Sequence, residues 1–273
     1  MTADLFYKSL PGRMLFIFLQ RAGFFRLAAW FLHTRMSKHL IHGYIRKHGI
    51  DMPHCDGQSY RSFAEFFSRK REKSDFAADP NVLISPCDGL LSVYTVTDGL
   101  EIPMKGSVYT LSDLVTCPET AELFRGGLCL VFRLEVSDYH HFCCIDDGRL
   151  IKTTYIPGEL HSVQPIALRS VPVFRLNRRW WSIMETKHFG MAVQIEVGAV
   201  LVGGVSLCVK DAGFNRGDEM GHFELAGSTI ILLLDSSVRK RLRFTESYAS
   251  LHGSGKEARV RTGVRIGDLT DEK

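Results

Sequence analysis

The chain carries a hydroxyl beside an unshielded peptide carbonyl near its C-terminal end, at Gly227-Ser228-Thr229. The apolar run 230–234 follows directly, so the serine stands at the mouth of a predicted buried strand. Glycine reaches unusual dihedral angles and leaves the approach to its own carbonyl open. A serine placed here is suited to attack the preceding peptide bond. The same residues are also typical of an ordinary turn before a strand.

A carboxylate of possible catalytic use lies far upstream, in the turn Ser85-Pro86-Cys87-Asp88-Gly89. Apolar runs flank this turn at 82–84 and 90–94, so Asp88 is expected at a strand end. An aspartate in such a turn usually caps backbone amides. Held rigidly, it is also able to orient a histidine.

A histidine pair follows the predicted strand 128–136, in the segment Asp138-Tyr139-His140-His141. Strand alternation places the two rings on opposite faces, so we expect only one to point into a site. A serine is a weak nucleophile and needs a base within hydrogen-bond reach, itself oriented by a third group. Asp88, His140 and Ser228 form such a set. The plainer interpretation is that each histidine satisfies a local hydrogen bond.

Together these segments resemble the phosphatidylserine decarboxylase family. The marks of that family are an Asp-Gly turn, an Asp-Tyr-His segment and a C-terminal Gly-Ser-Thr at which the proenzyme cuts itself. They occur here in the family's order. The similarity runs from about residue 8 to about residue 235 and includes further motifs: Pro11-Gly12-Arg13, Ser37-Lys38, Gly49-Ile50-Asp51-Met52, 62–70 and 197–203.

The resemblance implies a self-processing, pyruvoyl-dependent lyase. Ser228 would attack Gly227 and yield a β chain, residues 1–227, and an α chain, residues 228–273. Ser228 would become a covalent pyruvoyl group, the pyruvate cofactor, that forms a Schiff base with the lipid amine. Phosphatidylserine would lose CO2 to give phosphatidylethanolamine, with His140 supplying a proton and Asp138 orienting that histidine. The family also implies a homodimer of αβ units.

One position departs from the family pattern. Many members read Asp-Tyr-His-x-x-His, with the second histidine assigned to self-processing, and this chain has Cys143 there. Three side chains are therefore candidates for the general base of self-processing. We favour His140, place His141 second, and regard Cys143 as a poor base unless its pKa is perturbed.

The composition fits a cytosolic protein with one sizeable core. The chain has 273 residues, of which 45% are hydrophobic. It has seven cysteines, an odd number, and Cys143 and Cys144 are adjacent, so a disulfide framework is not expected.

The first fifty residues are both basic and apolar. They hold eight Lys or Arg side chains against one acid, Asp4. Gln20, Arg21 and Arg26 interrupt the apolar runs, so a transmembrane span is not expected, nor is a signal peptide. Helices lying in the interface of an anionic membrane fit best, which implies a peripheral protein on the cytoplasmic face of the cell membrane. Nucleic acid is not an expected partner.

The expected fold class is α+β. Residues 1–75 form a helical, membrane-associating region, in which Ser62 N-caps a helix over 63–70. Residues 76–273 form a β-rich catalytic domain with a mainly antiparallel, sandwich or barrel-like core. Strands are predicted near 82–84, 90–96, 128–136, 150–156, 170–176, 191–197, 200–209 and 229–235. We expect the polar tail after about Tyr248 to be poorly ordered.

Three other functions remain open. A zinc hydrolase would draw on His140, His141, Cys143 and Cys144 with His161, His188 or His222, but adjacent pairs lack the usual ligand spacing, and no metal is expected. A membrane-bound β-sandwich adaptor would need no Ser228. A processing-dead relative would keep an unbroken chain.

Overall fold

The computed structural model describes residues 3–50, 59–71, 76–77, 79–104, 107–200, 204–209, 213–225 and 228–270. Helices come first and strands follow, so the α+β class is confirmed. Gly227, one side of the expected cleavage site, lies outside the described residues, as do 51–52 and 201–203 of the similarity motifs.

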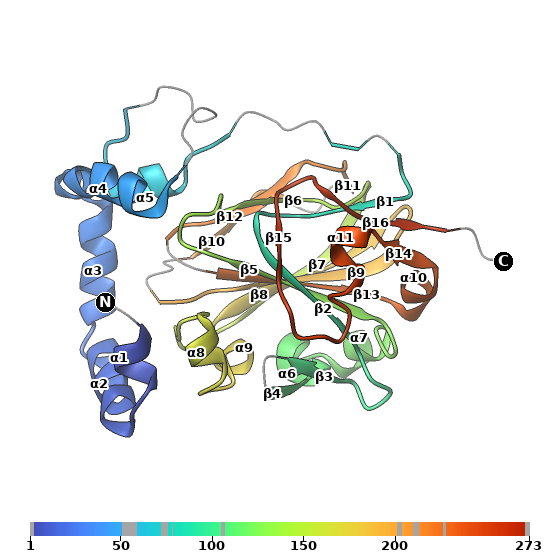
Figure 1. Ribbon diagram of the computed structural model, residues 1–273, viewed down its shortest axis with the longest axis horizontal. Coiled ribbons are helices and arrows are strands. Elements are labelled where there is room, and N and C mark those ends of the chain that lie inside the picture. The colour runs from blue at the N-terminus through green and yellow to red at the C-terminus, as the bar shows by residue number, and fades with distance from the viewer. Residues whose placement is uncertain are drawn as a thin grey trace.

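The N-terminal part is helical, as predicted for residues 1–50. Ser9 caps the second helix and accepts a hydrogen bond from Gly12, and Gly23 separates it from the third with φ of 77°. The elements are α1 (Ala3–Tyr7), α2 (Leu10–Arg21), α3 (Phe24–His33), the 3₁₀ turn η1 (Arg35–Lys38), α4 (His39–His48) and α5 (Phe63–Phe67). They stand together at one end of the molecule (Figure 1).

Helix α5 begins where the sequence predicts and ends early. The Ser62 hydroxyl accepts a hydrogen bond from the Glu65 amide at 3.2 Å, which confirms the cap. The Glu65 carboxylate in turn accepts from the amide of Arg61. The helix ends at Phe67, three residues short of the expected end.

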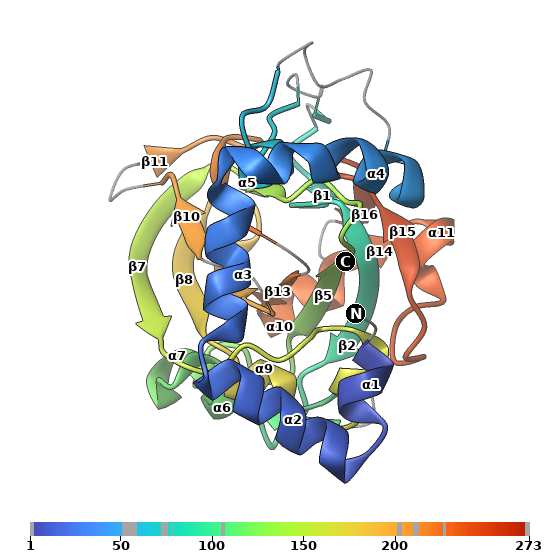
Figure 2. The same cartoon turned by 90° about the vertical axis from the view of Figure 1, so that its left-hand side faces the viewer.

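An eight-stranded antiparallel sheet forms the body of the protein, in the order β11-β7-β8-β9-β13-β5-β2-β15. The sheet is curved (Figure 2), but the described strands do not close into a barrel, because the outer strands β11 and β15 do not pair with each other. The strand bounds are β2 (Gly89–Thr95), β5 (Leu128–Leu134), β7 (Gly148–Ile156), β8 (Arg179–Thr186), β9 (Gly190–Val197), β11 (Gly213–Phe214), β13 (Ser228–Leu234) and β15 (Ala258–Val260).

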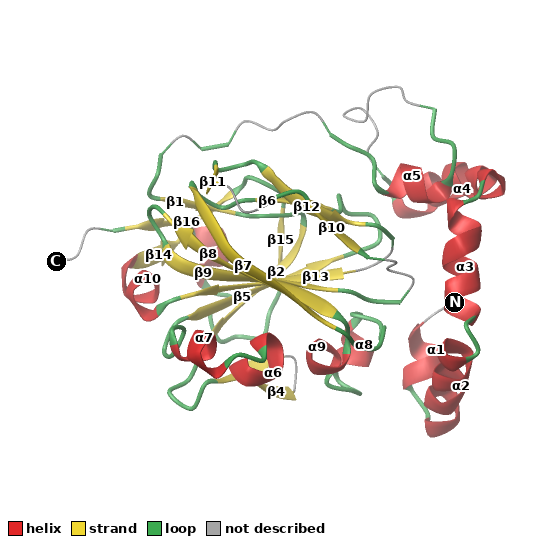
Figure 3. Cartoon of the chain, turned by 180° about the vertical axis from the view of Figure 1, so that it is seen from behind, coloured by secondary structure: helices red, strands yellow, loops and turns green. Residues whose placement is uncertain are grey.

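Smaller layers cover the two sides of this sheet (Figures 1 and 3). Two three-stranded sheets lie on one side, in the orders β1-β16-β14 and β10-β12-β6, with bounds Val82–Ile84, Arg265–Leu269, Leu242–Phe244, Val205–Leu207, Glu219–Phe223 and His141–Cys143. The other side carries the hairpin β3–β4 (Glu101–Met104, Ser107–Thr110) and helices α6 (Leu111–Val115), α7 (Pro118–Glu122), α8 (Pro165–Leu168) and α9 (Val173–Leu176). Helices α10 (Ser236–Arg241) and α11 (Glu246–Ala249) follow β13 and β14.

Two local predictions are wrong. The segment 170–176 forms a turn and helix α9 instead of a strand, because Pro172 at the helix N-cap lacks the amide that a strand ladder needs. The tail after Tyr248 is ordered in its described part, since β15 pairs with β2 and β16 pairs with both β1 and β14. The two strands are short, three and five residues, and contain charged side chains, so the sequence shows no clear apolar alternation there.

Strand β13 is the centre of the core. All seven of its residues are buried, with β5 on one side and β9 on the other. Ser228 is the first residue of this strand and pairs with Leu134 of β5. The serine backbone therefore sits at the start of a fully buried strand that is hydrogen-bonded to neighbours.

Candidate active site

Ser228 and His140 meet in the interior. The serine Oγ lies 3.3 Å from the histidine Nδ1, and both residues are 0% exposed. His140 lies in the loop between β5 and β6. Because β5 pairs with β13, this loop places the histidine next to the serine. The structure thus joins two of the three predicted site residues, 88 positions apart in sequence.

The other nitrogen of the His140 ring sets its protonation. Nε2 lies 3.1 Å from the carbonyl oxygen of Glu135. A carbonyl oxygen can only accept, so Nε2 carries the hydrogen and Nδ1 presents a lone pair to the serine hydroxyl. This is the tautomer that a general base for Ser228 requires.

The surroundings of His140 keep its ring neutral. Burial and, second to it, the positive charge of Arg69 lower the pKa of His140 to about 3, although the hydrogen bond with the Glu135 carbonyl and the Asp88 carboxylate oppose the shift. The ring of Phe67 packs on the imidazole with centroids 4.2 Å apart. The lowered pKa leaves the Nδ1 lone pair free to meet the serine hydroxyl, and an imidazolium formed by proton transfer returns its proton readily.

Asp88 lies outside this hydrogen-bond chain. Its carboxylate accepts from the Arg71 guanidinium at 2.7 Å, and from the amide and hydroxyl of Thr262 at 2.9 and 3.0 Å. The orienting partner of His140 is therefore the Glu135 carbonyl, where the sequence predicted Asp88. The carboxylate instead links the C-terminal segment that carries Thr262 to the turn before β2.

Asp138 acts on His140 only through the backbone. Its carboxylate accepts from the Glu135 amide at 2.7 Å and its own amide donates to the Glu135 carbonyl at 3.0 Å. Arg259 donates to the same carboxylate at 2.7 Å. Burial raises the pKa of Asp138. Asp138 therefore shapes the turn whose carbonyl holds the imidazole.

The other two candidate bases point elsewhere. His141 faces the opposite side, as strand alternation predicts, with its ring nitrogens 2.9 Å from Glu219 Oε1 and 3.0 Å from the Ser68 carbonyl. Cys143 is buried with its Sγ 4.0 Å from the Ser85 carbonyl, and burial raises the pKa of the thiol to about 12. Neither side chain contacts Ser228.

Arg69 is a site residue that sequence reasoning did not single out. It is 3% exposed and donates through Nη1 to the Phe66 carbonyl at 3.3 Å. In the described part of the chain, its Nε and Nη2 have no hydrogen-bond partner. A buried guanidinium with free N–H groups is suited to meet an anion. Its only sequence signal was membership of the motif 62–70.

A pocket of about 820 Å³ lies beside the segment that carries His140, although neither His140 nor Ser228 is among its lining residues. The residues around the buried histidine contribute to it, among them Asp138, Tyr139 and His141. Its cationic lining consists of Lys70, Arg71, Arg259 and Arg261. Three of these cations already pair with carboxylates, Lys70 with Glu219, Arg71 with Asp88 and Arg259 with Asp138, so the lining of the pocket carries charges of both signs.

The comparisons with known proteins agree with this geometry. A family profile described as phosphatidylserine decarboxylase matches residues 63–268. The chain belongs to the phosphatidylserine decarboxylase family. The match covers the Asp88 turn, His140 and Ser228 within one continuous region, as the sequence motifs predict.

Curated relatives from clostridia cover nearly the whole chain. Phosphatidylserine decarboxylase proenzyme 2 of Clostridium acetobutylicum is 37% identical over 97% of this chain and 91% of its own length. The phosphatidylserine decarboxylase proenzyme of Clostridium kluyveri is 36% identical over 93% and 88%. That of Ruminiclostridium cellulolyticum is 32% identical over 98% and 91%. The relatedness therefore includes the N-terminal helices.

Proposed function

We propose that this chain cleaves itself between Gly227 and Ser228 and then decarboxylates phosphatidylserine to phosphatidylethanolamine. The observation that carries the proposal is the buried Ser228–His140 hydrogen bond in a member of this family. The proenzyme names of the relatives support the cleavage, and their decarboxylase names support the reaction.

In the first step, His140 accepts the Ser228 hydroxyl proton at Nδ1. The serine Oγ attacks the Gly227 carbonyl carbon, an ester bond forms, the Gly227–Ser228 C–N bond breaks, and the proton passes to the freed amine. Loss of the Cα proton of residue 228 then breaks the ester Cβ–O bond and frees the Gly227 carboxylate. The remaining dehydroalanine tautomerises to an imine, and addition of water releases ammonia and leaves a pyruvoyl group.

The residues around position 228 fit such a group. Once formed, it supplies a ketone next to an amide, which accepts the electron pair released as CO2 departs. The backbone of residue 228 stays anchored to β5 through the β13 ladder. Nδ1 of His140, 3.3 Å from the serine Oγ, stays beside the converted residue as a hydrogen-bonding group. Proton delivery by His140 after CO2 loss stays a prediction.

The proposed cut leaves the two chains joined by buried polar contacts. Thr262 and Arg259 belong to the α chain, and they bind Asp88 and Asp138 of the β chain. Strand β13 of the α chain is hydrogen-bonded on both sides to β-chain strands. We therefore expect the fragments to separate only on denaturation. The homodimer of αβ units stays a prediction.

The test is the intact mass of the purified, denatured protein, combined with an assay of phosphatidylserine vesicles. The proposal requires two fragments, residues 1–227 and a pyruvoyl-blocked 228–273, together with release of CO2 and phosphatidylethanolamine. A single folded, unmodified chain would contradict it and would favour an adaptor or a processing-dead relative.

Arg69 is expected to stabilise negative charge during self-cleavage. Replacing Arg69 with methionine keeps much of the apolar packing and removes the charge, and we expect cleavage to slow by about 10- to 100-fold, because charge-assisted hydrogen bonds contribute about 1.5–3 kcal/mol. Arg125→Met, at an exposed ion pair with Glu122, is the matched control. Densitometry of uncut and cut chain over time measures the rate. Equal rates in both variants would remove Arg69 from the mechanism.

The N-terminal helices support a membrane-surface location on the cytoplasmic face. Most exposed large apolar side chains of the described chain lie there: Leu5, Leu10, Met14, Leu15, Ile17, Phe18, Phe24, Leu27, Trp30, Phe31, Met36 and Leu40. No single described helix is long and apolar enough to cross a bilayer, and α2 with α3 meets that criterion only as a pair bent by 59°. Apolar side chains among basic ones suit an anionic lipid interface.

The double substitution Phe18→Ser and Trp30→Ser is expected to weaken vesicle binding at least tenfold. Each side chain is 65% exposed, and burying one such group in lipid contributes about 1.5–3 kcal/mol. Co-sedimentation with anionic vesicles measures the affinity. Val108→Ser, which removes a 61%-exposed side chain on β4, is the control and should bind like the parent. Unchanged binding of the double variant would contradict helix docking.

A further inference from the structure

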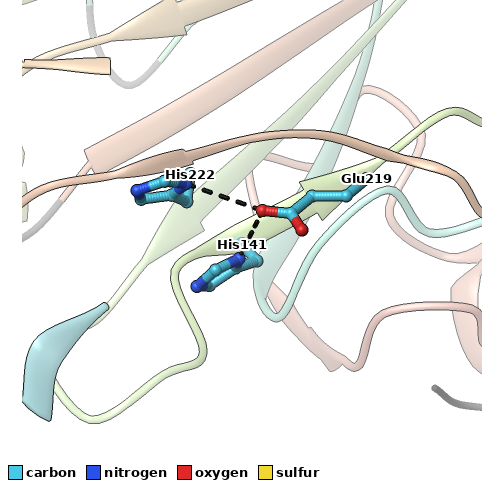
Figure 4. Close-up of side chains that lie close together, drawn as sticks. All are labelled: His141, Glu219 and His222. Carbon is cyan, nitrogen blue, oxygen red and sulfur yellow. Dashed lines mark hydrogen bonds and ion pairs between the residues drawn. The ribbon is translucent and has the colours of Figure 1, made fainter. Parts of the chain in front are cut away.

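A cluster of metal-ligand side chains lies on the small sheet next to the pocket. His141 of β6 and His222 of β12 are directly opposed across the two strands, and Glu219 stands earlier on β12 (Figure 4). The ligand atoms of these three residues lie within 4.8 Å of one another. Cys208, just after β10, brings its thiol to the same carboxylate. No step of the proposed reaction uses this cluster.

The spacing of the donor atoms suits a tetrahedral metal ion. From Glu219 Oε1, the distances are 2.9 Å to His141 Nδ1, 3.6 Å to His222 Nδ1 and 3.8 Å to Cys208 Sγ. Ligands bound to zinc at 2.0–2.3 Å in a tetrahedron lie about 3.3–3.7 Å apart. The donor atoms of His141, Glu219 and His222 lie within 4.8 Å of one another and approach this spacing, whereas the Cys208 Sγ lies near Glu219 alone and joins them after a rotation of its exposed side chain.

Neighbouring hydrogen bonds hold the side chains of the cluster in orientations that suit metal binding. The His141 Nε2 donates to the Ser68 carbonyl at 3.0 Å, which fixes the ring and turns Nδ1 toward the carboxylate. Lys70 holds the other oxygen of Glu219 at 2.9 Å. The His222 Nδ1 is buried and has no hydrogen-bond partner in the described part of the chain. A buried acceptor or donor left unpaired in this way is rare unless something else occupies the site.

We propose that His141, Glu219, His222 and Cys208 bind one zinc ion at the wall of the pocket. Two imidazoles, a thiolate and a carboxylate favour zinc over calcium or magnesium, which prefer oxygen ligands alone. The ion joins β6, β10 and β12 across the edge of the pocket, because each strand contributes a ligand or carries one at its end. The site is separate from the Ser228–His140 pair, so zinc binding does not depend on self-cleavage.

The first experiment titrates Zn2+ into the chelator-treated, full-length protein in competition with a chromophoric chelator. We expect one ion per chain, and an affinity at least about 100-fold lower for His222→Gln. His188→Gln is the matched control, because His188 also pairs with a carboxylate, Asp146, at 2.9 Å but lies outside the cluster. It should bind zinc like the parent.

Co2+ substitution tests the thiolate. The parent should show a sulfur-to-cobalt charge-transfer band, and Cys208→Ser should lose the band while keeping its fold. Because Cys208 is exposed, this variant also serves if His222→Gln does not fold. Failure of the parent to take up zinc, equal zinc affinity of His222→Gln and the parent, or a band that persists in Cys208→Ser would overturn the proposal.

Discussion

Replacing Ser228 with alanine is expected to leave one uncut chain of 273 residues, with no pyruvoyl group and no decarboxylase activity. The hydroxyl is the only group that the substitution removes. Its oxygen forms the ester and then leaves Cβ in the elimination, so without it neither the cut nor the later ketone at Cα forms. Since Ser228 is buried at the start of β13, alanine fills nearly the same space and the fold is expected to survive. Intact mass and circular dichroism measure the two outcomes.

Ser112→Ala is the control for this experiment. Ser112 is an exposed residue of α6, remote from β13, and its variant should process like the parent. Cleavage of Ser228→Ala between positions 227 and 228 would show that another group performs the attack. Loss of the native fold in the same variant would instead assign the hydroxyl a structural role.

Replacing His140 with glutamine is expected to slow self-cleavage by about 10²- to 10⁴-fold, the usual contribution of a general base. Glutamine is able to keep a hydrogen bond to the Glu135 carbonyl, but it offers no basic nitrogen to Ser228. The rate is measured from the fraction of cut chain after synthesis in a cell-free system. The slow variant should still yield the same two fragments after prolonged incubation.

Two histidine variants make this prediction specific. His252→Gln changes a ring that bonds Thr95 at 2.7 Å, near the end of β13 opposite to Ser228, and it should cleave at the parental rate. His141→Gln tests the second candidate base, whose ring faces Glu219 and Ser68. A block in His141→Gln with normal cleavage in His140→Gln would reverse our assignment of the base.

The pH dependence of self-cleavage follows from the environment of His140. A histidine base works in its neutral form, so a ring of ordinary pKa would give a rate that rises through about pH 6.5. Burial lowers the pKa of His140 to about 3, so the ring is already neutral above about pH 4. We expect a flat rate between about pH 5 and pH 8. A rise centred near pH 6.5 would show that another histidine titrates.

Much of the candidate site could be predicted from local patterns. The apolar run after Ser228 placed the serine at the start of a strand, and strand alternation separated His140 from His141. These features depend on neighbours within a few residues, which the linear sequence displays. The family motifs then supplied the order of the segments, and the family match confirmed the resemblance.

The partner of Asp88 could not be predicted in this way. Its carboxylate was expected to face His140, and it faces Arg71 and Thr262 instead. The tail that carries Thr262 has few apolar residues, so its pairing against β2 and β1 left no periodic signal. The pairing of the C-terminal strands with β2 and β1, which are distant in sequence, therefore decided which groups the Asp88 carboxylate contacts.

The sequence by itself determined the place of Ser228 at the start of a buried strand, the histidine segment, the α+β class and the basic, apolar N-terminal helices, because residue type and short-range spacing carry that information. Only the tertiary structure decided what orients His140. The partner is the Glu135 carbonyl, and every residue has a carbonyl, so no residue type marks it. The His141–Glu219–His222–Cys208 cluster likewise shows no characteristic metal-ligand spacing in the sequence. Its members meet through the pairing of β6, β10 and β12.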